Sequence, residues 1–322
     1  MASTSNIEHR TVNAEPSPNW NLTRRKSNLR TRAVILQAIR TFFTNEGYLE
    51  VDTPLLIPAP APEPHIDAIP AGQGFLHTSP ELCMKRLLAA GYERIFQICR
   101  CWRADERGGR HLPEFTMLEW YRAEVDYLDL MRECEELVRS VAVAAGNGMT
   151  IRYRDTVIDL TTEWERLTVR EAFHRYTASS MEEALANDTF DLLMVEAIEP
   201  RLGSRRPTFL HDYPAQHSAL ARLSASDPTV AERFELYVGG LELANAFSEL
   251  TDPVEQRHRF ACAAADRADR KRTAYPLPEP FLNELAAMPT AAGIALGIDR
   301  LVMVLLDAAT IDEVVAFTPE EL

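Results

Sequence analysis

One short stretch, residues 103–114, concentrates side chains that could bind or activate a nucleotide. It contains, within 12 residues, Arg103, Asp105, Glu106, Arg107, Arg110, His111 and Glu114. A guanidinium group can form paired hydrogen bonds to a phosphate or a carboxylate, and a neighbouring aromatic ring can stack on a base. The stretch therefore suits a nucleotide held for chemistry, and the alternative is a solvated hairpin tip.

The runs on either side of this stretch are rich in aromatic and apolar residues and favour β-strands. Because side chains alternate between the two faces of a strand, one face of each strand can be predicted. The first face carries Cys99, Cys101 and Arg103. The second carries Phe115, Met117, Glu119 and Tyr121. We expect a sheet surface with an Arg, a Glu, a Tyr and a Phe below a polar loop.

A second group of chemically capable residues surrounds a Gly-Gly pair at 239–240, which predicts a two-residue β-hairpin. In that register Tyr237 opposes Glu242, and Glu235 opposes Ala244. Glu235 and Glu242 then become diagonal neighbours on one face. Two such carboxylates repel unless a cation bridges them, and magnesium prefers oxygen ligands. The alternative is an acidic, exposed sheet face.

Two further charged residues lie in the first turns of expected helices. Glu81 follows Ser79 and Pro80, and the helix dipole alone explains a carboxylate there. Arg300 begins an apolar helix, where the dipole disfavours a cation, so packing does not explain it. The run before Arg300 contains Gly297, and glycine allows a ligand to approach the backbone closely.

The elements that must position these residues can be predicted in outline. Helical spacing indicates a helix over 27–46 with Ser27 as N-cap and Gly47 as its stop. We further expect a short strand from Tyr48 that ends at Pro54, strands within 151–160 and 207–215, and helices over 128–145 and from Thr168. The Pro/Gly-rich loop 58–74 either covers a substrate or is a surface excursion. His211 and Asp212 are interpreted as a structural pair rather than as site residues.

Composition limits the class of protein. The 322 residues are 46% hydrophobic, which is enough for a core, and no run of about 18 apolar residues predicts a membrane span. The first residues lack the apolar segment of a signal peptide, and five cysteines without a Cys-x-x-Cys pair argue against disulfides and structural zinc. A reducing cytoplasm fits. A net charge of −14 disfavours nucleic-acid binding, and the basic run at 24–32 is interpreted as an exposed helix face.

Four runs of the sequence resemble the ordered motifs of class II aminoacyl-tRNA synthetases, most closely those of the lysyl branch. The segments at 102–105 and 111–116 are similar to Phe-Arg-Asn-Glu and His-Asn-Pro-Glu-Phe-Thr, and the segment 242–249 to Glu-x-x-Asn-Gly-Phe-Ser-Glu. The segment 293–300 resembles Gly-Leu-Gly-Ile-Gly-Ile-Asp-Arg. Asp105 stands where the family has a Glu, and Ala104 and Leu112 each replace an Asn.

The resemblance implies an α+β fold, a class II catalytic core with an antiparallel sheet flanked by helices, and the use of ATP with Mg2+. It implies that the catalytic groups are Arg103, Arg300 and Glu242, with Glu235 and Glu242 as metal ligands. The ATP-binding residues are expected to be Arg103, Asp105, His111, Phe115, Glu242, Leu243, Gly297 and Arg300. The substrate-binding residues are expected to be Ser79, Pro80, Glu81, Tyr121, Asn245, Phe247, Glu249 and Ala295, with Glu249 gripping the lysine ammonium. Simple alternation puts Glu249 and Glu242 on opposite faces, so a bulge or strand end between them is required.

We expect a polar tail over 1–24 and one catalytic domain over 25–322. A polar tail of this length is too short to form the anticodon-binding barrel that lysyl-tRNA synthetases carry ahead of the catalytic domain. The chain therefore resembles the elongation factor P β-lysine ligases, a family of free-standing class II cores. That resemblance implies (R)-β-lysine as substrate, elongation factor P as acceptor, a homodimer, and no stable tRNA or membrane binding. The alternatives are a minimal lysyl-tRNA synthetase and a non-catalytic lysine sensor.

Overall fold

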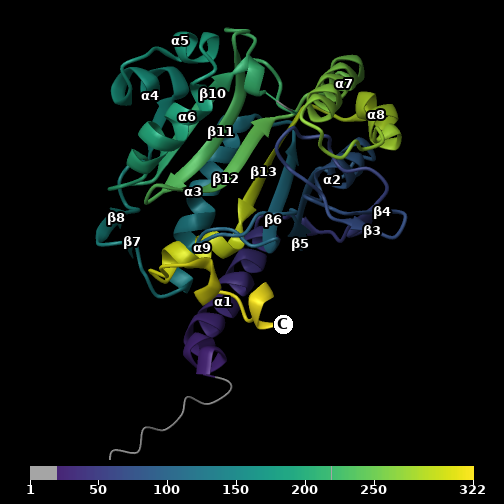
Figure 1. Ribbon diagram of the computed structural model, residues 1–322. Helices are drawn as coiled ribbons and strands as arrows, with labels where there is room; N and C mark the ends of the chain where they lie inside the picture. Colours follow the sequence, from purple (N-terminus) through teal and green to yellow (C-terminus); the bar gives the residue numbers. More distant parts are fainter. Residues whose placement is uncertain (1–19, 219) are drawn as a thin grey trace, which may run out of the picture.

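The computed structural model describes residues 20–218 and 220–322, and its centre is an eight-stranded mixed sheet (Figure 1). The strands are β1 (Leu49–Glu50), β2 (Leu56–Ile57), β3 (Pro70–Ala71), β4 (Gly74–Leu76), β5 (Arg94–Trp102), β6 (Glu114–Ala123), β7 (Thr150–Tyr153), β8 (Thr156–Asp159), β9 (Glu165–Thr168), β10 (Thr208–Pro214), β11 (Val230–Val238), β12 (Leu241–Ser248) and β13 (Ala291–Gly297).

The helices differ in length and are distributed around this sheet. They are α1 (Trp20–Asn45), α2 (Glu81–Ala89), α3 (Tyr127–Ala144), α4 (Val169–Tyr176), α5 (Met181–Ala186), α6 (Phe190–Leu193), α7 (Pro253–Asp269), α8 (Glu279–Glu284) and α9 (Ile298–Leu305). A π-helical turn spans Met194–Ile198, and 3-10 turns span Glu199–Arg201, Ala215–His217, Leu285–Ala287, Ile311–Glu313 and Pro319–Glu321. None of these helices, within the described part of the chain, is both long and apolar enough to cross a bilayer.

The strand order is β1-β5-β6-β13-β12-β11-β10-β9. All neighbours from β5 to β10 are antiparallel, and the two edge pairs, β1 with β5 and β10 with β9, are parallel. The main apolar core joins α1, α3 and α9 to one face of this sheet, while a smaller core joins α2, α7 and α8 beside β6 (Figure 1). The α+β class expected from the sequence is confirmed.

Most predicted elements form, with shifted ends. The helix expected over 128–145 is α3, the helix from Thr168 is α4 with its capping box, and the strand over 207–215 is β10. The short strand expected to end at Pro54 is wrong in extent, because only the two residues of β1 pair with β5 and the next pairing is that of β2.

The first helix begins earlier than predicted. α1 starts at Trp20, so Ser27 lies inside the helix and is not its N-cap, and residues 20–24 of the expected tail are helical. The rest of that tail lies outside the described residues. The extra turns pack against the end of the chain, where Arg25 forms two hydrogen bonds to Glu321 at 2.6 and 2.9 Å.

The β11–β12 hairpin contains a bulge that the sequence did not reveal. Gly239 and Gly240 have φ values of 62° and 70°, as the tight turn requires. Tyr237 opposes Glu242 as predicted, but the register shifts at the next pair and leaves Leu243 unpaired. The predicted pairing of Glu235 with Ala244 is therefore wrong, because Glu235 opposes Asn245.

The bulge has a direct consequence for the chemistry. One extra residue in a strand reverses the alternation of every side chain beyond it. Glu242 therefore shares a face with Asn245 and Phe247, and all three line one cavity. The same reversal gives Glu249 the parity of Glu242, but Glu249 lies beyond the end of β12 and does not line the cavity, so the two carboxylates do not share one pocket.

A buried ion pair ties three distant elements together. Arg32 of α1 lies 2.6 Å from Asp299 of α9 and donates a hydrogen bond to the Thr116 hydroxyl of β6. The other oxygen of Asp299 accepts the backbone N–H of Thr116 at 2.8 Å. Arg32 is only 9% exposed, so the interpretation of the basic run as an exposed face is wrong at this residue.

We expect the substitution Arg32→Met to lower the free energy of unfolding by about 3–5 kcal/mol, because it leaves the Asp299 charge buried without its partner. Urea unfolding followed by circular dichroism measures this change. The matched control is Arg40→Met, which breaks a pair with Glu50 whose side chains are both 41% exposed, and should cost about 0–1 kcal/mol. Equal losses in the two variants would contradict a special role for the buried pair.

Candidate active site

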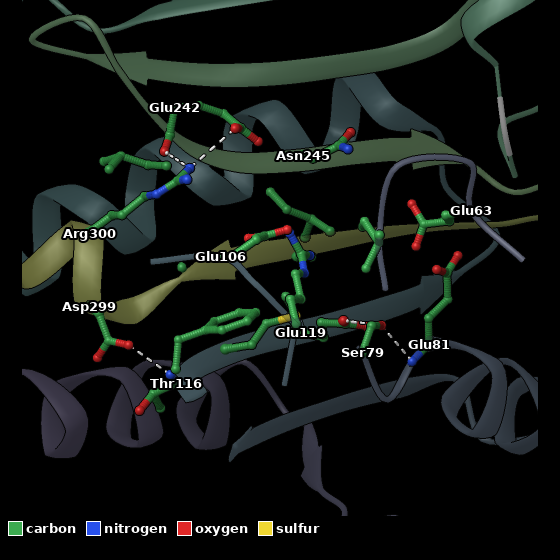
Figure 2. A pocket seen from close by; sticks show the side chains of 18 of the residues that line it. Glu63, Ser79, Glu81, Glu106, Thr116, Glu119, Glu242, Asn245, Asp299 and Arg300 are labelled. Atoms are coloured by element: carbon green, nitrogen blue, oxygen red, sulfur yellow. Dashed lines mark hydrogen bonds and ion pairs between the residues drawn. The ribbon is translucent and has the colours of Figure 1, made fainter. Parts of the chain in front are cut away.

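A cavity lies over β6, β13 and β12 and collects most of the residues that the sequence singled out (Figure 2). The predicted site residues that line it are Ser79, Glu81, Arg103, His111, Phe115, Tyr121, Glu242, Leu243, Asn245, Phe247, Ala295, Gly297 and Arg300. They come from segments up to about two hundred residues apart, so the sheet, and not sequence proximity, brings them together. Figure 2 shows Arg300 and Glu242 at one end, and Ser79, Glu81 and Glu63 at the other.

Four arginines line the cavity. They are Arg103, Arg110, Arg233 and Arg300. The guanidinium of Arg103 lies 5.1 Å from the ring centre of Phe115, and its Nε is buried with no hydrogen-bond partner among the described residues. A buried N–H without an acceptor is unfavourable, so the cavity at Arg103 is suited to an anionic ligand that supplies one.

His111 is kept neutral beside these cations. Burial lowers its pKa to about 4, and repulsion from Arg300, Arg103 and Arg110 adds to the shift. Its Nε2 therefore stays free to accept a hydrogen bond, which Arg300 donates. Arg300 also donates to the backbone oxygen of Glu242 at 3.0 Å and to its carboxylate at 3.2 Å. The sequence-predicted group of His111, Arg300 and Glu242 is thus in mutual contact.

Beside Ser79, the cavity holds a carboxyl group, that of Glu119, for which no role was expected from the sequence. Glu119 lines the cavity, is 1% exposed, and accepts hydrogen bonds from Ser79 at 2.5 Å and Tyr121 at 3.0 Å. Burial raises its pKa well above the usual value, and the nearby Glu81 raises it further. No cation pairs with it within residues 20–218 and 220–322. The signal that could have revealed it is a carboxylate within an apolar strand, on the same face as Phe115 and Tyr121.

Glu249 has a different position from the one expected. It does not line the cavity, and its carboxylate lies 2.5 Å from the ammonium of Lys85, which also binds Glu81 at 2.6 Å. It lies behind Gly293, where an added Cβ would come within 2.6 Å of Glu249 and 2.2 Å of the Tyr121 ring. Burial raises the pKa of Glu249 to about 8, and Lys85 opposes that shift. The chain itself therefore supplies a cation to Glu249.

Three carboxyl groups lie close enough to perturb one another at the hairpin. Burial and then Glu235 raise the pKa of Glu242, and burial followed by Glu235 and Glu242 raises that of Glu199 to about 7. Glu235 itself does not line the cavity and is bonded to Arg233 and Tyr237, each at 2.7 Å. Oxygen donors with excess negative charge fit a hard divalent cation such as Mg2+. Glu199 lies in a 3-10 turn far away in the sequence, and no local pattern marked it.

Two further predicted site residues, Asp105 and Pro80, do not line the cavity. Asp105 does not line the cavity, because it adopts a left-handed backbone with φ 62° in the loop, and its neighbour Glu106 lines the wall instead. Pro80 also does not line it, since it only precedes α2, where the Ser79 hydroxyl accepts the N–H of Glu81 at 2.9 Å.

The loop 58–74 forms part of the cavity wall, so the first of its two interpretations is favoured. Glu63 and Ile66 line the cavity. The loop is held by Arg267 of α7, whose side chain is fully buried and donates to the backbone oxygens of Glu63 and Ile66 at 2.7 and 2.8 Å and to Asp67 at 2.6 Å. His211 and Asp212, in contrast, pair with each other at 3.1 Å outside the cavity, as the structural interpretation predicted.

The comparisons with known proteins agree with this fold. The family model described as tRNA synthetases class II (D, K and N) matches residues 19–321, and the chain belongs to that family. Within it, the chain is 40% identical over 321 residues to a protein of Edwardsiella ictaluri, covering 93% of this chain and 97% of that protein. It is 40% identical over 314 residues to one of Enterobacter sp., covering 90% and 94%, and 41% identical over 309 residues to one of Salmonella dublin, covering 90% and 94%. All three relatives are named elongation factor P--(R)-beta-lysine ligase, and the chain belongs to this ligase family.

We expect the imidazole of His111 to titrate near pH 4, and Arg300→Gln to move that midpoint upward toward 6.5 without reaching it, because burial remains the larger cause. Above this pH the ring is neutral and accepts a hydrogen bond, and below it the ring is charged and repels the guanidinium groups. NMR titration of the ring protons measures both midpoints. Arg107→Gln is the control, since Arg107 pairs with Asp312 and Glu320 in the same region. A wild-type midpoint at 6.5 would contradict the neutral state.

Proposed function

We propose that this chain uses ATP to activate (R)-β-lysine as an aminoacyl-adenylate and then transfers the aminoacyl group to a lysine side chain of elongation factor P. The names of the relatives support this substrate and acceptor. The observation that carries the proposal is that one cavity holds both arginine side chains, among them Arg103 with a buried Nε that has no hydrogen-bond partner among the described residues, and the buried carboxyl group of Glu119, with which no cation of the described chain pairs. A substrate with ammonium groups joined to a nucleotide phosphate would supply both missing partners.

The first step needs charge stabilisation and no nucleophilic side chain. The substrate carboxylate attacks the α-phosphate of ATP, and pyrophosphate leaves with its electron pair. Arg103 and Arg300 neutralise the charge that develops on the phosphate oxygens, while Phe115 offers a ring face to the base. Glu235 and Glu242, with Glu199 beside them, are the residues that would hold Mg2+, which would supply further neutralisation. In the second step the acceptor lysine amine attacks the mixed anhydride and AMP leaves.

The acidic end positions the amino acid. Glu119 is the carboxyl group that an ammonium can reach directly, since Glu249 is already bound to Lys85. Because burial raises the pKa of Glu119, the arrival of an ammonium releases its proton and forms a buried ion pair. Glu249 acts on the acidic end indirectly, because it pairs with Lys85, which also pairs with Glu81. Homodimerisation and the absence of stable tRNA binding stay predictions from the resemblance.

The decisive experiment is ATP–pyrophosphate exchange with (R)-β-lysine and with α-lysine, followed by mass measurement of elongation factor P after incubation with the full reaction. We expect exchange that prefers (R)-β-lysine and an acceptor that gains one aminoacyl group. Efficient charging of tRNA in place of the protein would favour the minimal lysyl-tRNA synthetase. Binding of lysine and ATP without any exchange would favour the sensor.

We expect Glu119→Gln to raise the KM for (R)-β-lysine at least thirtyfold, corresponding to roughly 2 kcal/mol or more for one partner of a buried charge pair. The KM for ATP should change little, because Glu119 lies at the acidic end. Glu114→Gln is the matched control on β6, since that side chain is 54% exposed and paired with Arg100 at the surface. Equal losses for both substrates would argue against recognition of the ammonium by Glu119.

Ala295 offers a test of which lysine isomer is preferred. It lies in β13 between Asn245 of β12 and Glu119 of β6, and it lines the cavity floor. We expect Ala295→Gly to shift the ratio of kcat/KM toward α-lysine by roughly tenfold, because removal of one methyl group changes the fit of isomers by about 1–3 kcal/mol. The measurement compares both substrates in both proteins. An unchanged ratio would remove Ala295 as a determinant of specificity.

A further inference from the structure

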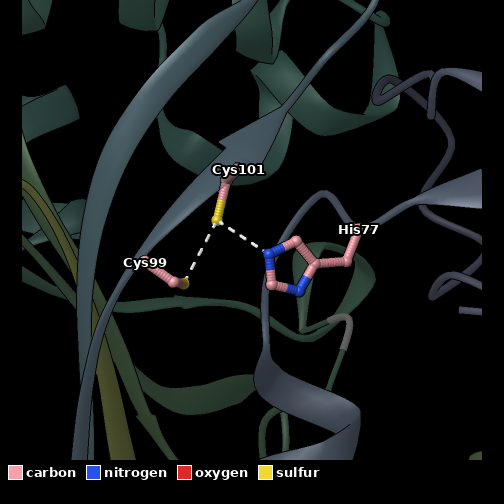
Figure 3. A group of neighbouring side chains, drawn as sticks. All are labelled: His77, Cys99 and Cys101. Atoms are coloured by element: carbon pink, nitrogen blue, oxygen red, sulfur yellow. Dashed lines mark hydrogen bonds between the residues drawn. The ribbon is translucent and has the colours of Figure 1, made fainter. Parts of the chain in front are cut away.

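A cluster of soft metal-ligating side chains lies beneath the cavity and has no part in the chemistry described above. It consists of His77, Cys99 and Cys101 (Figure 3). Cys99 and Cys101 share one face of β5, as strand alternation predicts, and His77 comes from the segment between β4 and α2. His77 and Cys101 are 0% exposed and Cys99 is 9% exposed, so all three are shielded from bulk solvent.

Two of the three distances between the ligand atoms are close to those of a tetrahedral zinc site. The two sulfur atoms are 3.9 Å apart, the Cys101 sulfur is 3.9 Å from Nε2 of His77, and all three ligand atoms lie within 4.8 Å of one another. Zinc bound at ~2.3 Å from sulfur and ~2.1 Å from nitrogen has sulfur–sulfur edges of about 3.8 Å and sulfur–nitrogen edges of about 3.6 Å. The side chains are therefore already placed close to the geometry of a bound ion.

The chemistry of the donors selects the kind of ion. Two thiols and an imidazole are soft and borderline donors, which favour zinc over magnesium or calcium. The nearest side chain toward the cavity, Met117, adds another soft sulfur, 4.0 Å from that of Cys101. Two thiolates and a neutral imidazole cancel the charge of a divalent ion, whereas a monovalent ion would leave a net negative charge in a buried site.

We propose that His77, Cys99 and Cys101 form a binding site for one Zn2+ ion. Binding forms two zinc–thiolate bonds and one zinc–imidazole bond, and the two thiols release two protons. The Nε2 of His77, which now lies 2.7 Å from the backbone oxygen of Arg100, exchanges that contact for the ion. The proposal does not depend on the proposed function, because the ligands are separate from the residues that line the cavity.

The site would fix one wall of the active-site cavity. The backbone oxygen of His77 accepts the N–H of Trp102 at 3.0 Å, so β5 and the segment before α2 are already in contact there. Two residues after His77, the Ser79 hydroxyl donates to Glu119. An ion that bridges His77 to β5 therefore stiffens the segment that carries Ser79 and Glu81. The expectation of no structural zinc rested on the lack of a Cys-x-x-Cys pair, and it did not cover a site in which the histidine is distant along the chain from both cysteines.

The test uses the full chain, reduced and stripped of metal, in wild-type form and as the variants Cys101→Ser and Cys262→Ser. We expect one equivalent of zinc after gel filtration in the wild type and in Cys262→Ser, and none in Cys101→Ser. Cys262→Ser is the matched control because Cys262 is exposed and lies 3.7 Å from His258, a second cysteine–histidine pair that could bind zinc. Cobalt added in place of zinc should give a thiolate-to-metal charge-transfer band that Cys101→Ser lacks.

Two further measurements follow the effect of zinc on cysteine alkylation and on thermal stability. In Cys262→Ser, we expect zinc to block alkylation of Cys99 and Cys101, located by peptide mass spectrometry, and to leave that of Cys83 unchanged. Zinc should also raise the Tm of this protein but not that of Cys101→Ser, because a ligand that binds only the folded state stabilises it. Less than a tenth of an equivalent of bound zinc in the wild type, or full retention in Cys101→Ser, would overturn the proposal. Zinc retention by the wild type and by Cys101→Ser is judged independently of the pyrophosphate-exchange result, so the two proposals can fail separately.

Discussion

The candidate active-site cavity is built around buried ionisable groups whose polar atoms lack a partner in the described chain. The carboxyl group of Glu119 is enclosed with a raised pKa and no cation pairs with it, and the Nε of Arg103 is buried without a hydrogen-bond acceptor. Burial of such groups without partners is unfavourable, so each is better satisfied when a ligand supplies the missing partner. Under the proposed function, the ammonium of the amino acid and a phosphate of the nucleotide would be those partners.

Lys85 shows how the chain limits this cost. It is buried, and although burial by itself lowers its pKa, attraction to Glu249 and Glu81 outweighs that effect and raises it. One internal ammonium thus pairs with two carboxylates, Glu249 and Glu81, and no cation of the described chain pairs with Glu119. Under the proposed function, an ammonium group of the substrate would pair with Glu119.

The sheet gives the site its rigidity. Asn245, Ala295 and Glu119 form one row across three neighbouring strands, and Phe247, Gly293 and Tyr121 form the next row. Backbone hydrogen bonds fix each row, so small side chains in β13 set how closely the flanking groups approach a ligand. Outside the sheet, the pair of Arg32 and Asp299 anchors α1 and α9 to β6, and Arg267 holds the loop that covers the cavity.

The sequence by itself determined what depends on neighbours two to four residues apart. Strand alternation placed Phe115, Met117, Glu119 and Tyr121 on one face, a Gly-Gly pair located the hairpin, and capping residues located α4. These signals are local because backbone geometry repeats over short distances. The resemblance to class II synthetases added roles for individual residues that periodicity could not supply.

Only the tertiary structure decided which distant groups meet. It placed Lys85 against Glu249, turned Glu106 toward the cavity in place of Asp105, and inserted the bulge at Leu243 that brings Glu242 and Asn245 to one face. It also brought Glu199 near the hairpin carboxylates, and His77 to two cysteines of β5. Each of these contacts depends on how separate elements pack, and a packing arrangement is fixed by the shape and burial of the whole core, which no short window of sequence contains.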